Sequence, residues 1–108
     1  MNRPISYQTL PRAAFQALMA LVKERFPATA QKLLGRLRNG ADTNRELLVP
    51  VRMLVYNILG EKSYERYTGY EWAAMQGDRR AETAWIRMLN VCRMLIARPA
   101  ASPAICLN

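Results

Sequence analysis

Prolines and glycines divide this chain into short segments, and most of these segments carry an apolar stripe with helical spacing. The breaks fall at Pro11, Pro27, Gly40, Pro50, Gly60, Gly77 and Pro99. Proline ends or redirects a helix because it lacks a backbone N–H and clashes with the preceding turn, and glycine suits the residue after a helix. The pattern therefore predicts an all-α fold, a compact single-domain bundle of five or six short helices.

The first and last predicted helices have the clearest patterns. After Pro11, the apolar stripe consists of Phe15, Leu18, Met19, Val22 and Phe26. The last helix is predicted over 79–97, with Asp78 as its N-cap and a core face of Ala81, Ala84, Trp85, Met88, Cys92 and Leu95. Between them, a second helix is predicted over 29–38, with Thr29 as its N-cap and Leu33, Leu34 and Leu37 on its buried face.

The middle of the chain leaves alternatives open. Thr43 and Glu46 fit a capping box, and Pro50 then either ends a short helix over 43–49 or opens the next one. Residues 51–59 are apolar almost all round, which predicts a central helix, with a buried strand as the alternative. A second capping box, Thr68 to Glu71, predicts a short helix that closes at Gly77.

A chain of 108 residues suffices for one domain, which we expect over 1–98. Residues 1–10 have no apolar period and are expected to form an extended arm, and residues 99–108 a mobile tail. There is no apolar run of roughly 18 residues, so no transmembrane helix and no membrane partner are expected. Two distant cysteines do not form a disulfide framework, and the expected compartment is the cytoplasm.

The absence of histidine and the small number of cysteines exclude several kinds of catalytic and metal-binding site. Without histidine, the chain lacks Ser-His-Asp and Cys-His catalysis and histidine-bound zinc. Cys92 and Cys106 are too few for a cysteine-only zinc site, and the common glycine-rich phosphate loops do not occur. Carboxylates four residues apart, at Glu61 and Glu65 and again at Asp78 and Glu82, are adequately explained by a helix surface. We therefore expect no enzyme activity, no catalytic residue, no metal site and no cofactor.

Charge supplies the first functional hypothesis. The chain has 16 Lys and Arg against 8 Asp and Glu, a net charge of +8. Five basic residues on two predicted helices are the candidate phosphate contacts: Lys32, Arg36 and Arg38 on the second helix, and Arg80 and Arg87 on the last. An ordinary solvated basic surface is the alternative interpretation of the same residues.

Aromatic residues supply the second hypothesis. Tyr64, Tyr67, Tyr70 and Trp72 lie within nine residues, together with Arg66. Aromatic rings beside arginine can stack on the bases of single-stranded nucleic acid, so Tyr67 and Tyr70 are the candidate base-stacking residues. Such residues also anchor protein interfaces, which indicates Tyr64, Arg66, Tyr67 and Tyr70 as partner-binding residues. A purely structural alternative places Trp72 and one tyrosine in the core, with the others at its rim.

These observations lead to two functional expectations. The first is a small, basic, non-enzymatic helical protein that binds DNA or RNA. The second is an inhibitor or adaptor that binds an acidic protein surface, of the kind encoded by phages or plasmids and directed at a host defence or transcription complex. A homo-oligomer is compatible with both.

Overall fold

The computed structural model describes residues 10–40 and 42–97, and within them it contains five α-helices and no strand. The helices are α1 (Arg12–Arg25), α2 (Pro27–Arg38), α3 (Asn44–Leu59), α4 (Glu61–Met75) and α5 (Arg79–Ala97). The predicted all-α fold is confirmed, and the strand alternative for residues 51–59 is wrong. The predicted tail, 99–108, and residues 1–9 of the predicted arm lie outside the described residues.

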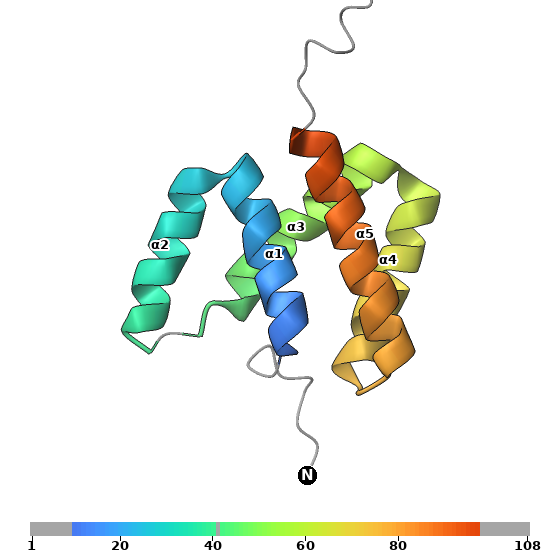
Figure 1. The fold of residues 1–108 in the computed structure, drawn as a ribbon, viewed down its shortest axis with the longest axis horizontal. Helices are drawn as coiled ribbons and strands as arrows, with labels where there is room; N and C mark the ends of the chain where they lie inside the picture. The colour runs from blue at the N-terminus through green and yellow to red at the C-terminus, as the bar shows by residue number, and fades with distance from the viewer. Residues whose placement is uncertain (1–9, 41, 98–108) are drawn as a thin grey trace, which may run out of the picture.

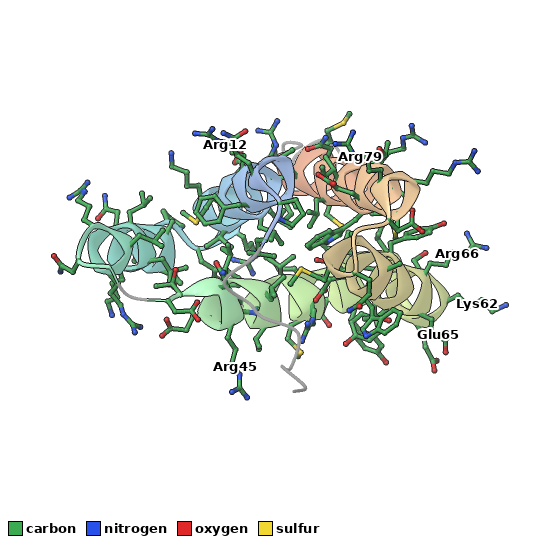
Figure 2. The ribbon with its side chains drawn as sticks, turned by 90° about the horizontal axis from the view of Figure 1, so that it is seen from below. Arg12, Arg45, Lys62, Glu65, Arg66 and Arg79 are labelled. Atoms are coloured by element: carbon green, nitrogen blue, oxygen red, sulfur yellow. The ribbon has the colours of Figure 1, made fainter. Side chains whose placement is uncertain are left out.

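The helices form two layers (Figure 2). One layer consists of α1 and α5, which run side by side in the same direction (Figure 1). The other consists of α3 and α4, and α4 also packs against α5. Helix α2 lies at the edge of the molecule, against α1. No helix among the described residues is both long enough and apolar enough to cross a bilayer.

The core lies between the two layers and draws on all five helices. Trp85 and Tyr67 are its largest fully buried side chains. Around them pack leucine and valine residues, among them Leu18, Val22, Leu47, Leu48, Val51, Val55 and Leu89. Cys92 is also fully buried, as a free thiol. On α5, the predicted core face is correct at Ala81, Trp85 and Cys92 and wrong at Leu95, which is exposed, whereas Leu89 was missed.

The chain redirects between α1 and α2 at Phe26, as the proline after it predicts. Phe26 has φ −132° and ψ 67°, outside the α region that the following proline disfavours. Pro27 is the first residue of α2, where its missing N–H is not needed. The predicted start at Thr29 is therefore two residues too late.

Helix α3 passes through Pro50 without a break, so both predicted alternatives are wrong there. An internal proline removes one backbone hydrogen bond and costs about 3 kcal/mol. The helix continues because residues on both sides of the proline are buried on one face: Leu47 and Leu48 before it, and Val51, Leu54 and Val55 after it. The predicted capping box also fails, because Thr43 makes no side-chain cap bond and its buried Oγ1 has no hydrogen-bond partner.

Helix α4 is likewise one helix, and the short helix predicted to open at Thr68 is wrong. The Thr68 hydroxyl donates to the Glu65 carbonyl oxygen, 3.0 Å away, within the helix. Gly60, with φ 92°, ends α3 and precedes α4, in a conformation that favours glycine. Helix α4 ends at Met75, two residues before the predicted closing residue Gly77, which lies in the α4–α5 turn with φ 104°.

Asp78 caps α5 as predicted, and this cap is a testable feature. Its Oδ1 accepts hydrogen bonds from the backbone N–H groups of Arg80 (2.9 Å) and Ala81 (3.1 Å). Asp78→Ala leaves these donors without that acceptor, so we expect the free energy of unfolding to fall by about 1 kcal/mol. Urea denaturation followed by circular dichroism measures this loss. Asp78→Asn keeps an acceptor and serves as the control; equal losses in both variants would contradict the capping role.

Candidate nucleic-acid interface

A groove of about 640 Å³ runs between α4 and α5. Its lining comes from Arg66, Gly69, Tyr70 and Ala73 of α4, and from Asp78, Arg80, Ala81 and Ala84 at the start of α5. It therefore brings together three residues that the sequence singled out separately: Arg66, Tyr70 and Arg80. Two of these are guanidinium groups and the third is an aromatic ring.

The small residues of the two helices explain why a groove forms here. Gly69 and Ala73 lie four residues apart on α4, and Ala81 and Ala84 three apart on α5, so each pair occupies one side of its helix. Side chains of this size leave space between the helices that larger residues would fill. Arg66 and Arg80 are exposed, and Tyr70 is half-buried.

The only carboxylate in this lining belongs to Asp78, and it is already engaged. Its Oδ1 accepts the two backbone hydrogen bonds that cap α5. The two arginines thus give the groove a positive charge that a single, partly committed carboxylate offsets only in part. Arginine holds phosphate oxygens through two parallel N–H donors, so the lining is chemically suited to a phosphate.

Arg87 extends the basic surface beyond the groove. It lies seven residues after Arg80, two helical turns or about 10 Å along α5, and hence on the same side of that helix. Both side chains are exposed. The two predicted phosphate-contacting residues of α5 therefore share one side, next to Arg66 of α4.

The basic residues of α2 lie elsewhere. Helix α1 separates α2 from α5 (Figure 1), so the five predicted phosphate contacts do not form one patch. Arg36 makes an ion pair with Glu46 of α3, while Lys32 and Arg38 are exposed. The structure thus favours Arg80 and Arg87 over the α2 residues as members of one surface.

Two of the aromatic predictions need correction. Tyr67 is fully buried, so its ring offers no surface to a base or a partner. Trp72, which the structural alternative placed in the core, is 62% exposed. Tyr64 is half-buried and packs edge-on against Tyr56 of α3, with ring centroids 5.4 Å apart and an interplanar angle of 89°.

Sequence reasoning missed a buried polar group beside Tyr67. Glu71 of α4 is 4% exposed and accepts hydrogen bonds from Nε and Nη2 of Arg52 on α3. The Nε distances to the two carboxylate oxygens are 3.1 and 3.2 Å. Tyr67, Glu71 and Ala74 follow the i, i+4, i+7 spacing of a core face, which is the signal that could have revealed it.

Burial sets the ionisation of two groups in the core. Burial raises the pKa of the Tyr67 phenol far above its usual range, and the negative charge of Glu71 raises it further. Burial also raises the pKa of the Cys92 thiol to about 11. Both groups are therefore protonated at neutral pH, and neither is activated as a nucleophile.

Other hollows and clusters in the described part of the chain are less suited to a phosphate. A hollow of about 370 Å³ between α1 and α5 is lined by Lys23 and Arg93, but also by Glu24. No group of three or more Cys, Asp or Glu residues within 10–40 and 42–97 is placed to hold a metal ion.

The comparisons with known proteins add no assignment to this geometry. The chain matches no protein-family model, no curated protein and no solved structure.

Proposed function

We propose that the protein binds nucleic acid through the α4–α5 groove, without catalysing a reaction. Arg66 and Arg80 contact backbone phosphates at the groove, Arg87 contacts the backbone further along α5, and Tyr70 packs against a sugar or a base. The observation that carries this proposal is the convergence of Arg66, Tyr70 and Arg80 around a groove with a floor of small residues.

Charge and accessibility support the proposal. A net charge of +8 on 108 residues attracts a phosphate backbone at long range. The three arginines are exposed, so binding does not require the helices to separate. The burial of Tyr67 takes one residue from each hypothesis, one of two base-stacking rings from the first and one of four partner-binding anchors from the second, so the two exposed arginines at the groove are what favour a phosphate ligand.

The test compares two double charge reversals that change the net charge equally. Arg66→Glu/Arg80→Glu alters the groove, and Lys32→Glu/Arg38→Glu alters exposed residues of α2. Fluorescence anisotropy with labelled duplex DNA and single-stranded RNA, from about 50 to 200 mM salt, gives the affinity and its salt dependence. We expect the groove variant to bind roughly tenfold or more weakly and to lose about two units from the log–log salt slope, one per phosphate contact.

The α2 variant controls for charge alone. It is expected to keep the wild-type slope and most of the affinity. Equal losses in both variants would show that net charge, and not the groove, determines binding. Absence of wild-type binding at the lowest salt concentration would overturn the proposed function itself.

A further inference from the structure

The outer side of the α3–α4 layer exposes four large apolar side chains. Val49, Met53 and Tyr56 follow each other at i, i+4 and i+7 along α3, and their exposed fractions are 45%, 59% and 46%. Trp72 of α4 is 62% exposed. Grouped apolar side chains of this size on a surface, with an exposed tryptophan among them, are typical of a protein interface.

Helices α3 and α4 pack against each other, and one ring contact joins the α3 stripe to α4. The Tyr56 ring packs against Tyr64, which connects the α3 stripe to α4. Trp72 lies seven residues after Glu65, about 20° away around α4, so these two residues lie on the same side of that helix. We call Val49, Met53, Tyr56 and Trp72 the outer apolar patch.

Opposite charges flank the two ends of the outer apolar patch. Arg45 and Glu65 both project from the α3–α4 side of the molecule, and they lie well apart along its length (Figure 2). Arg45 is in the first turn of α3, about 16 Å along the helix axis before Tyr56. Glu65 is near the start of α4 and follows Tyr64, the residue against which the Tyr56 ring packs. Both side chains are exposed.

We propose that the outer apolar patch binds a second copy of this chain. The two copies are related by a two-fold axis that lies in the plane of contact. This axis is perpendicular to the line from Arg45 to Glu65 and passes through its midpoint. It sets Arg45 of each copy opposite Glu65 of the other and so forms two equivalent ion pairs. The apolar residues between them then meet their counterparts near the axis and are removed from water.

The charge arrangement is what selects a second copy as the occupant. A partner surface of uniform charge would attract one end of the patch and repel the other. A copy of the same surface, turned by the two-fold axis, offers the opposite charge at both ends. The α4–α5 grooves would then lie at opposite ends of the dimer, outside the contact, so self-association and nucleic-acid binding are separable.

Two matched methionine variants test the apolar part. Met53 lies in the patch and Met94 lies on α5, and their side chains are exposed to a similar degree, 59% and 66%. Sedimentation equilibrium of the full chain measures the dimer dissociation constant. We expect the wild type to be a dimer, Met53→Glu to be monomeric, and Met94→Glu to remain a dimer. Circular dichroism of each variant confirms that the helices are retained.

Charge exchange tests the orientation. Arg45→Glu and Glu65→Arg each place like charges opposite one another twice, and each is expected to weaken the dimer at least about tenfold. The double variant Arg45→Glu/Glu65→Arg restores both pairs and is expected to return to within about threefold of the wild type. A monomeric wild type, equal effects of the two methionine variants, or a double variant as weak as the single ones would overturn the proposal. Each of these results leaves nucleic-acid binding by the groove unaffected as a separate question.

Discussion

Replacing Glu71 with leucine is expected to lower the free energy of unfolding by about 2–3 kcal/mol. The change removes the carboxylate to which Arg52 donates from Nε and Nη2. Breaking a fully buried ion pair at one partner costs about 3–5 kcal/mol, because the remaining charge keeps its desolvation penalty. Arg52 is 30% exposed, so water reaches it in part and the expected loss is smaller than for a fully buried pair. Urea denaturation followed by far-ultraviolet circular dichroism measures the loss.

Two controls separate this effect from the loss of any ion pair. Glu46 pairs with Arg36, but both side chains are about half exposed, so Glu46→Leu is expected to cost less than about 1 kcal/mol. The double variant Arg52→Leu/Glu71→Leu removes both charges and is expected to recover much of the stability lost in Glu71→Leu. If Glu71→Leu and Glu46→Leu cost the same, the buried pair does not have the role assigned to it.

The helix ends that the sequence predicted best are those that depend on local chemistry. Pro27 ends α1, Asp78 caps α5, and Gly60 and Gly77 adopt positive φ values. Each of these effects acts within a turn or two of the residue, so neighbouring residues suffice to predict it. The spacing of apolar residues then identified most of the buried face of α1 and α5.

The helix interiors were mispredicted where packing outweighs local preference. Pro50 and Thr68 both have strong local reasons to mark a helix end, yet α3 and α4 continue through them. Burial of Leu47, Val51 and Val55 across the proline offsets the lost hydrogen bond, and this depends on helices far along the chain. Single-sequence reasoning therefore placed two breaks that the tertiary structure removes.

The same error changed the assignment of the aromatic residues. A helix that starts at Thr68 leaves the orientation of Tyr67 undefined, whereas one continuous α4 turns Tyr67 and Glu71 inward and Trp72 outward. Arg66, Tyr70 and Arg80 were each predicted as functional residues. Their meeting at one groove depends on how α4 packs against α5, which no spacing within either helix reveals.

Raising the pH from about 8 to about 11 is expected to lower the free energy of unfolding by about 3–4 kcal/mol. Burial raises the pKa of Cys92 to about 11 in the folded state, against about 9 in the unfolded chain. Burial and Glu71 raise the pKa of Tyr67 well above its ordinary value of 10. Between the unfolded and folded pKa values, the unfolded chain has released a proton that the folded chain still holds, so stability falls as the pH rises. By about pH 11 this amounts to about 2 kcal/mol from Cys92 and about 1 kcal/mol from Tyr67.

Two substitutions apportion this loss between the groups. Cys92→Ala removes the thiol, so its stability is expected to stay level up to about pH 10 and to fall only above it. Tyr67→Phe removes one buried hydroxyl and keeps the ring, so its stability at pH 8 should remain within about 1 kcal/mol of the wild type. Above about pH 10 this variant should lose stability less steeply than the wild type. Urea denaturation at each pH, under reducing conditions, gives these values. A wild-type slope that persists in both variants would show that other groups govern alkaline unfolding, because removing either buried proton would then leave the difference in proton binding unchanged.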